Sequence, residues 1–509
     1  MHGPRAYARR LATWVSLRHP KTARLLGFAH AKRRPLWRVF LIVMHIIGFI
    51  QSISAVMDTR TSQGAIAWAL SLNTIPVIAV PAYAIFGDND FTTYVATRNA
   101  GLEEVRPTAE ALIASIHEAD VARTDREGLM GTLSNLSSLP VTLGNKPELL
   151  VDGKNTFRSI FEAIDQAEKY ILVQFYIIRS DSTGWDLANR LMEKARAGVE
   201  VYFLYDDYGS LGMSDDYIRQ LRDSGVHMQS FLNLMGGANR FQLNFRNHRK
   251  LVIVDGKTAF VGGHNVGDEY LGMHPTLTPW RDSHMRLTGP VVTCLQVPFA
   301  EDWHWASGKT LSDLDWNIAS KKDITGETAE AICIPTGPAD PMETCSLAFL
   351  ACINASRERL WIATPYFVPD EPIIQALQLA SRRGVDVRIL IPELFDSELV
   401  RFSSYSYLRD MEMAGAQVWR YQKGFLHQKV MLVDQDFVSI GSANLDNRSF
   451  RLNFELQVGV RDRDFNKKVE AMLLEDFSNA RRASPEELND KSAPFKLGVR
   501  ISRLLAPIQ

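Results

Sequence analysis

The stretch NHRKLVIVDGKTAFVGGHN, residues 247–265, decides the fold, because its pattern returns as LHQKVMLVDQDFVSIGSAN at residues 426–444. Each copy holds a His and a Lys two residues apart, an Asp five residues after the Lys, and an Asn 17 residues after the His. A chance match of four residue types at fixed spacing, twice in one chain, is very improbable. The sequence therefore predicts two copies of one domain, each contributing half of a site.

The residues after each Lys predict two strands joined by a turn. Leu251–Val254 and Val430–Val433 are apolar, and after a turn at the Asp come Thr258–Val261 and Phe437–Ile440. Small residues then precede each Asn, where backbone can approach a ligand. A His and a Lys two apart on a strand point to one face. Each copy is thus expected to offer an imidazole, an ammonium and an amide to a common point.

The flanking pattern is that of an α/β fold. Tyr170–Ile178 predicts a strand, Trp185–Ala197 a helix and Val199–Tyr205 another strand. The first of these returns about 190 residues later as Leu360–Val368. Alternating helices and apolar strands favour an α/β fold with a largely buried sheet.

Composition is that of a globular protein of several domains. The chain has 509 residues, with 57 Lys+Arg, 58 Asp+Glu and 46% hydrophobic residues. The four Cys lie in no CxxC or Cys/His spacing, which argues against a zinc site or a disulfide scaffold.

Two uncharged runs near the amino terminus predict a membrane hairpin. Val39–Met57 and Gly64–Gly87 span 19 and 24 residues, each enough to cross a bilayer, and Pro76 and Pro81 are expected to kink the second. Residues 1–38 hold ten Lys/Arg and no acid, which places the amino terminus, and after two spans the rest of the chain, in the cytoplasm. A signal peptide and two buried soluble helices are the alternatives.

The expected organisation has six parts. They are a basic cytoplasmic segment (1–38), two transmembrane helices (39–87), a connector (88–141), a first domain (142–330), a second domain (331–482) and a tail (483–509). The tail alternates basic and apolar residues, so it is either a membrane-interfacial helix or a capping helix.

The duplicated residues suit chemistry on a phosphodiester. Two Lys and two Asn can neutralise and hydrogen-bond the non-bridging oxygens. One neutral His can attack phosphorus, and the other, protonated, can donate to the leaving alkoxide and later accept a proton. The expected catalytic set is His248, Lys250, Asp255, His427, Lys429 and Asp434, supported at the substrate phosphate by Asn265, Asn444, Asp282 and Glu455.

Acidic residues are expected in supporting roles. Asp255 and Asp434 fall at strand ends, where structural hydrogen bonding is favoured over catalysis. A carboxylate behind each His would fix its tautomer, from Asp282 in the first half and Glu455 in the second. Because the two Lys supply the charge that a metal would supply, we expect neither a metal nor a cofactor.

These motifs resemble the phospholipase D superfamily, whose HxKxxxxD motif with GG/GSxN stands here twice. Within it the chain is most similar to bacterial membrane-anchored cardiolipin synthases, over nearly its whole length. The supporting segments are Asn247 to Lys250, Val261 to Tyr270, Trp280 to Asp282, Ala300 to Trp303, Tyr366 to Asp370 and Gly441 to Phe450. The resemblance implies two duplicated phospholipase D-like domains, each a mixed sheet flanked by helices, with the site at their pseudo-twofold interface.

The resemblance also implies the reaction and the location. Two phosphatidylglycerols would give cardiolipin and glycerol, with His248 as nucleophile and His427 as general acid and base, at the bacterial inner membrane. A phospholipase D hydrolase, or a transferase that uses another donor such as phosphatidylethanolamine, remains an alternative. A nuclease is disfavoured and no nucleic acid partner is expected, because residues 88–509 are acidic overall.

Overall fold

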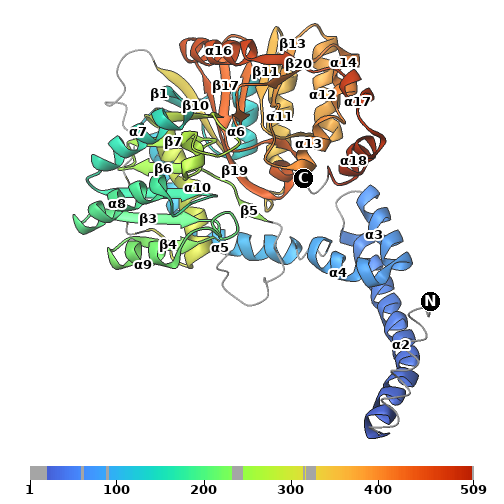
Figure 1. Cartoon of the computed structure of the whole chain (residues 1–509). Helices are drawn as coiled ribbons and strands as arrows, with labels where there is room; N and C mark the ends of the chain where they lie inside the picture. The colour runs from blue at the N-terminus through green and yellow to red at the C-terminus, as the bar shows by residue number, and fades with distance from the viewer. Residues whose placement is uncertain are drawn as a thin grey trace. The chain divides into compact units, whose positions relative to one another are not determined.

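The structure is a computed structural model with two compact units. It describes residues 20–58, 62–87, 91–125, 127–231, 245–312, 314, 316, 328–506 and 509. One unit contains residues 1–94, and the other contains Val95–Gly237 and Phe245–Gln509 (Figure 1). The first 19 residues of the predicted basic segment lie outside the described part of the chain.

The amino-terminal unit is built from helices packed on one another. They are α2 (Pro20–Asp58), α3 (Ser62–Thr74) and α4 (Pro76–Phe86). Their contact is close at Gly48 of α2, where a Cβ would lie 2.3 Å from the carbonyl oxygen of Leu72 on α3. A small apolar cluster that includes Ala55, Leu72 and Tyr83 holds the three helices together.

The first predicted membrane span is confirmed as a helix, and the second is divided. Among the described residues, Pro35–Met57 is the one helical stretch long and apolar enough to cross a membrane, and only 17% of its most apolar window is buried. The second run breaks at Ile75 rather than bending, because Pro76 lacks an N–H and starts a new helix instead. Pro81 lies inside α4. A second crossing by α3 and α4 stays a prediction.

Among the described residues of the larger unit, 16 strands form one sheet. Apart from β5, its order is β20-β14-β13-β11-β16-β17-β19-β10-β1-β9-β7-β6-β2-β3-β4. The first-half strands are β1 (Thr142–Val151), β2 (Tyr170–Phe175), β3 (Glu200–Tyr205), β4 (His227–Ser230), β5 (Arg246–Asn247), β6 (Leu251–Val254), β7 (Thr258–Gly262) and β9 (Ser283–Thr288). The second-half strands are β10 (Ala329–Thr336), β11 (Arg359–Ala363), β13 (Asp386–Pro392), β14 (Gln417–Tyr421), β16 (Val430–Val433), β17 (Phe437–Gly441), β19 (Asn453–Arg461) and β20 (Ala480–Arg482).

The strand order is nearly a mirror image about its centre. There β1 and β10 pair antiparallel, with Thr142 opposite Ala331. Outward from them, β9, β7, β6, β2, β3 and β4 correspond to β19, β17, β16, β11, β13 and β14. The last three of each series pair in parallel and the others antiparallel, so the sheet is mixed as the resemblance implied. The expected domain boundary at residue 330 falls inside β10, and the two halves share one sheet.

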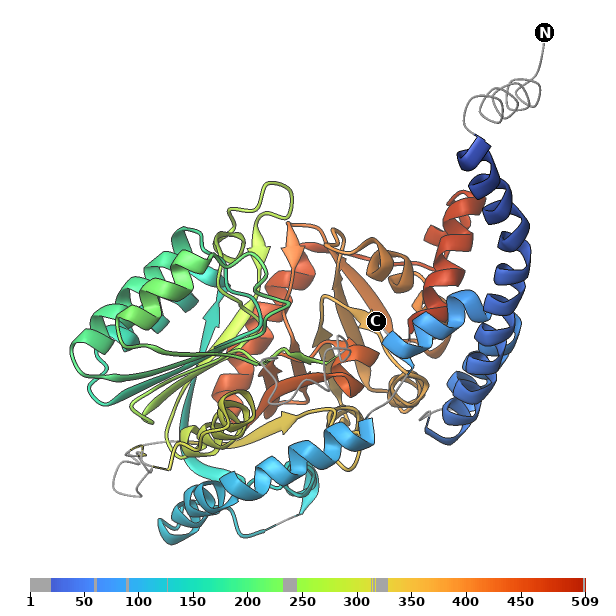
Figure 2. The ribbon, with the colours of Figure 1, turned by 90° about the horizontal axis from the view of Figure 1, so that it is seen from below.

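Helices cover the sheet in both halves (Figure 2). In the first half these are α7 (Asp152–Asp165), α8 (Ser182–Arg196), α9 (Asp215–Asp223) and α10 (Val291–Ser307), after the connector helix α5 (Phe91–Glu118). In the second they are α11 (Thr344–Ala355), α12 (Glu371–Arg382), α13 (Glu398–Ser404), α14 (Leu408–Ala414), α16 (Arg463–Ser478) and α18 (Ala493–Leu504), joined by α6 (Gly128–Ser137), which packs into the second-half core. Equivalent helices start in the same way, since the side chains of Asp181 and Asp370 cap α8 and α12. Each half has its own apolar core.

Candidate active site

Short strands carry each motif His across to the opposite half. Just before His248, β5 pairs in parallel with β19 of the second half, and the His248 N–H donates to the Phe454 carbonyl at 2.9 Å. Just before His427, β15 (Phe425–Leu426) pairs in parallel with β8 (Trp280–Arg281) of the first half. The His427 N–H donates to the Arg281 carbonyl at 2.8 Å. The motif of each half is therefore fixed in place by the other half.

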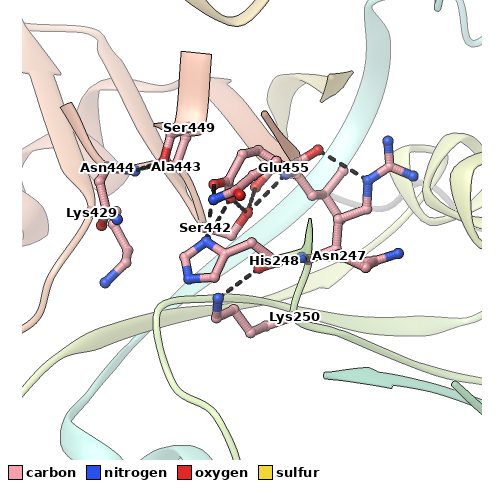
Figure 3. Close-up of polar contacts among 12 residues, drawn as sticks. Asn247, His248, Lys250, Lys429, Ser442, Ala443, Asn444, Ser449 and Glu455 are labelled. Atoms are coloured by element: carbon pink, nitrogen blue, oxygen red, sulfur yellow. Dashed lines mark hydrogen bonds and ion pairs between the residues drawn. The ribbon is translucent and has the colours of Figure 1, made fainter. Parts of the chain in front are cut away.

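This exchange decides which carboxylate supports which histidine. The two Glu455 carboxylate oxygens lie 3.0 and 2.9 Å from His248 Nδ1 (Figure 3). Asp282 Oδ2 lies 2.8 Å from His427 Nδ1. We expected each half to supply its own carboxylate, and that pairing is wrong. Asp282 directly follows β8 and Glu455 lies within β19, and pairing with β15 and β5 brings each carboxylate beside the His of the opposite half.

The two lysines lie against the backbone of their own histidines. Lys250 Nζ donates to the His248 carbonyl at 2.6 Å, and Lys429 Nζ to the His427 carbonyl at 2.5 Å. Burial lowers both ammonium pKa values, that of Lys429 to about 8. Glu455 and Asp282 oppose this effect on both lysines, and Lys429 lowers the Lys250 pKa further. His and Lys lie in the segments before β6 and β16 rather than within a strand as expected, because the residues just before them pair with the opposite half.

Electrostatics set the protonation of the first pair. Burial, reinforced by the two lysines, lowers the pKa of His248 to about 4 despite Glu455. Burial opposes ionisation of Glu455, but His248, Lys250 and the Ser442 hydroxyl outweigh it and hold the Glu455 pKa at about 2. An ionised Glu455 requires the proton of neutral His248 on Nδ1, which leaves the lone pair on Nε2.

The second pair, His427 and Asp282, differs from the first in the groups that set its protonation. Burial raises the pKa of Asp282, and burial together with both lysines lowers the pKa of His427 well below its usual value. Lys429 Nζ lies 3.0 Å from His427 Nδ1, the same nitrogen that faces Asp282. An ammonium that donates to Nδ1 favours the tautomer with its proton on Nε2.

One difference between the two motifs has a steric cause. Ser442 Oγ donates to Glu455 Oε2 at 2.6 Å, and Asn453 Nδ2 donates to Glu455 Oε1 at 3.1 Å. At the equivalent first-half position, a Cβ on Gly263 would lie 2.1 Å from Asp282 Oδ1. A side chain at position 263 would therefore push the Asp282 carboxylate out of its place beside His427.

The two motif asparagines are used differently. Asn265 Oδ1 accepts from the Ile177 N–H at 3.1 Å, and its Nδ2 donates to the Tyr270 hydroxyl at 3.0 Å. Asn444 Oδ1 is buried and has no hydrogen-bond partner within the described part of the chain. The amide of Asn444 is therefore the one of the two that is not committed to the protein's own hydrogen bonding.

The motif aspartates have structural contacts. Asp255 accepts from the N–H groups of Glu168, Lys169 and Tyr170, where β2 begins. Asp434 accepts from the N–H groups at the start of β11, those of Arg357, Glu358 and Arg359. Both sit in left-handed turns, with φ of 52° and 50°. They join the turn after each motif to a neighbouring strand. These contacts fit the structural role that the strand-end positions favoured, rather than a place in the catalytic set.

Sequence reasoning missed a second pair of buried carboxylates. Asp302 on α10 accepts from Arg249 Nη1 at 2.8 Å and Asn247 Nδ2 at 2.9 Å, and it pairs with Arg98 of α5 at 2.7 Å. Asp476 on α16 accepts from Gln428 Nε2 at 3.1 Å and from Arg281 Nε at 2.8 Å. Each holds the residue between the motif His and Lys. A repeat that marks them, Glu-Asp-Trp at 301–303 and Glu-Asp-Phe at 475–477, was visible in the sequence.

Two further acids near the first motif, Asp206 and Asp268, accept hydrogen bonds from backbone N–H groups. Asp206 is buried and accepts from the N–H groups of Asn247, Tyr208 and Gly209. Asp268 accepts from the N–H and hydroxyl of Thr183. Within the residues that the structure describes, no group of three or more His, Cys, Asp or Glu is placed to hold a metal ion.

The mirrored sheet and the duplicated His–Lys site define a duplicated phospholipase D-like α/β protein. A family model described as "Cardiolipin synthase, PLD-like domain" matches residues 160–274 and 349–477. The fold is similar to the crystal structure of a phosphatidylserine synthase from Haemophilus influenzae Rd KW20, with a TM-score of 0.59 and 17% identity. That likeness covers 75% of this chain and 100% of the other.

Curated relatives narrow the class to a family. Cardiolipin synthase A of Pseudomonas putida (strain W619) is 46% identical over 469 residues, which cover 92% of this chain and 97% of the relative. Cardiolipin synthase A of Pseudomonas syringae pv. syringae (strain B728a) is 45% identical over 476 residues, covering 91% and 97%. The chain belongs to the cardiolipin synthase family of phospholipase D-like proteins.

Proposed function

We propose that this chain is a phosphatidyltransferase that makes cardiolipin, moving a phosphatidyl group from one phosphatidylglycerol to another and releasing glycerol. The observation that carries the proposal is the convergence of two histidines and two lysines, with each His held by a carboxylate of the opposite half. Transfer through a covalent intermediate needs a nucleophile and a separate proton donor. A single buried site with two imidazoles, whose Nδ1 atoms have different hydrogen-bond partners, meets that need.

His248 is the nucleophile in this proposal. Ionised Glu455 holds the proton on His248 Nδ1, so the Nε2 lone pair is free to attack phosphorus. The new N–P bond forms as the bond from phosphorus to the leaving glycerol oxygen breaks. Lys250, Lys429 and the uncommitted Asn444 amide stabilise the negative charge on the non-bridging oxygens.

His427 is the general acid and then the general base. As an imidazolium, His427 donates its Nδ1–H to Asp282 and presents the Nε2 proton to the leaving alkoxide, which leaves a neutral imidazole. The negative charge of a bound phosphodiester raises the His427 pKa, because an opposite charge nearby favours the imidazolium. In the second step the terminal hydroxyl of an acceptor phosphatidylglycerol gives its proton to His427 and attacks phosphorus. The N–P bond breaks, and cardiolipin leaves with both histidines restored.

Product analysis tests the reaction. Purified full-length protein in detergent would receive labelled phosphatidylglycerol alone, then with phosphatidylethanolamine or excess glycerol. We expect cardiolipin and glycerol from phosphatidylglycerol alone, at a rate that survives prolonged chelation. Phosphatidic acid as the main product would instead make the protein a hydrolase, and cardiolipin formed only with phosphatidylethanolamine present would change the donor.

We also propose that the chain is a multi-pass protein of the bacterial inner membrane, with its catalytic unit in the cytoplasm. The apolar helix Pro35–Met57 and the strongly basic sequence before it support this orientation. Cysteines placed by K467C on α16 and by Q63C between the two uncharged runs would be treated with a membrane-impermeant thiol reagent. We expect Q63C to react in spheroplasts and K467C only after permeabilisation. Reaction of K467C in sealed spheroplasts would reverse the topology.

A further inference from the structure

Helix α18, near the end of the chain, is held firmly on its inner face. Val499 and Ser502 are each 1% exposed. The Ser502 hydroxyl lies 2.5 Å from that of Ser403 on α13, and the Ser403 hydroxyl donates to the Gln509 side chain at 2.8 Å. The Phe495 ring packs 5.0 Å from that of Phe402, centroid to centroid. The orientation of α18 on the catalytic unit is thus fixed by both polar and aromatic contacts.

The outer face of α18 carries an apolar stripe made of Leu497, Ile501 and Leu504. Their exposed fractions are 60%, 49% and 79%, high for three large apolar side chains on one helix. Spacings of four and three residues put them on one side of the helix. A helix that only caps the fold would gain nothing from such a stripe, whereas a contiguous exposed apolar surface marks an interaction site.

The charges around the stripe identify its partner. From Ala493 to Gln509 the chain carries Lys496, Arg500 and Arg503 and no acidic residue. Arg503 pairs with Asp410 at 3.3 Å. Arg500 is exposed, and no carboxylate lies within ion-pair distance of it in the part of the chain that the structure describes. Apolar side chains flanked by cations are the pattern of helices that lie in the interface of an anionic bilayer.

We propose that α18 docks the catalytic unit on an anionic phospholipid surface, with Leu497, Ile501 and Leu504 inserted between acyl chains and Arg500 at the headgroups. A second copy of this chain fits the stripe less well. Three side chains are a small part of the ~1,200 Å² that a stable protein interface buries, and two copies would bring like charges together. The capping and interfacial alternatives for the tail thus describe two faces of one helix. The proposal concerns binding and does not rest on the reaction proposed above.

Lipid quenching of a fluorophore tests this contact in the full-length protein. The four native cysteines are buried, and burial raises the pKa of each thiol, so a thiol-reactive fluorophore selects an introduced cysteine. The test variant is L504C. The matched control is K467C on α16, whose native side chain is 72% exposed. Both proteins would be reconstituted in vesicles of phosphatidylcholine containing acyl-chain spin labels, with or without phosphatidylglycerol.

We expect strong quenching at position 504, rising with the phosphatidylglycerol fraction, and little at 467. Adding R500E to L504C should reduce the quenching at least twofold in anionic vesicles. Equal and weak quenching at both positions would overturn the proposal, as would quenching at 504 that ignores lipid charge. A label at 504 that is shielded without lipid quenching, together with L504C cross-linking between chains, would assign the stripe to a second copy instead.

A second variant tests whether the contact between α18 and the lipid surface affects the rate of turnover. In L497S/I501S/L504S all three changed side chains are exposed, so the Tm should stay within a few degrees of the unchanged protein. We expect the initial rate on phosphatidylglycerol in vesicles to fall several-fold, while the rate on the same lipid dispersed in detergent is unchanged. An equal fall in both would contradict a role in membrane docking. Complete inactivity of the unchanged protein would count against the proposed reaction and leave the quenching result standing.

Discussion

The two half-sites contain the same motif residues but differ in the hydrogen bonds behind each histidine. Behind His248, Glu455 receives the Ser442 hydroxyl and the Asn453 amide as well as the imidazole, and its pKa is about 2. Behind His427, Asp282 shares the imidazole Nδ1 with Lys429, and burial raises the Asp282 pKa. Duplication supplies two equal imidazoles, and the packing gives each a different set of hydrogen-bond partners, which is the basis of the different roles proposed for them.

The residue between His and Lys, which contacts a buried carboxylate in both motifs, is charged in the first half and neutral in the second. In the first half, Arg249 stands between His and Lys and forms a buried ion pair with Asp302. In the second half, neutral Gln428 takes that place and Asp476 pairs with Arg281 instead. Each half thus has a buried ion pair behind its histidine, but the cation is the motif's own Arg249 in the first half and Arg281 of β8, from the opposite half, in the second.

The largest expected effect separates the roles of the two histidines. H248A and H427A should each lower turnover of phosphatidylglycerol by more than about 10⁴-fold, since neither imidazole can replace the other. A phosphatidyl ester of p-nitrophenol, whose leaving group needs no protonation, divides them. With it, H427A should release one equivalent of nitrophenol in a burst, and H248A none. A burst from H248A alone would reverse the assignment.

The carboxylates behind the histidines should be unequal in effect. E455Q removes an ionised group that fixes the nucleophile's tautomer, and we expect kcat/KM to fall about 10³–10⁴-fold, as when a carboxylate behind a catalytic His is lost. D282N should cost about 10²-fold, because Lys429 also contacts His427 Nδ1. The measurement is kcat/KM for both variants with unchanged Tm as the control for folding. A larger loss in D282N would contradict the asymmetry.

Much of the fold and of the motif chemistry could be predicted from the sequence, because both depend on patterns of neighbouring residues. The strands after each Lys, the turn at Asp255 and the equivalence of the halves follow from short-range periodicity. The crossed carboxylates do not, since β5 and β15 are two-residue strands whose partners lie about 150–210 residues away in sequence. Asp302 and Asp476 were missed because, on a helix, a buried acid looks like a surface residue until its partners are placed.

The buried ion pair should matter more for stability than its counterpart. D302N removes the carboxylate that pairs with Arg249 and Arg98, and breaking a buried pair costs about 3–5 kcal/mol. D476N should cost about 1–2 kcal/mol, because burial already raises the Asp476 pKa to about 6 and Arg281 keeps Asp152 as a partner. The Tm of full-length protein in detergent should fall more in D302N. Equal shifts would show that the charge under His248 is compensated elsewhere.

The smallest effect is the shape of the pH profile. Below about pH 4, His248 becomes protonated and loses its lone pair, and above about pH 8, Lys429 loses the charge that holds the phosphate. Because the bound phosphodiester keeps His427 protonated, we expect kcat at saturating phosphatidylglycerol to fall about tenfold per pH unit on both sides of a plateau between these values. K429R stays charged and should remove the alkaline limb at a lower plateau rate, because a guanidinium does not reproduce the geometry of an ammonium. K250R is the matched control in the first half and should keep the limb near pH 8. Loss of the limb in K250R, with its retention in K429R, would assign that titration to the half-site of the nucleophile.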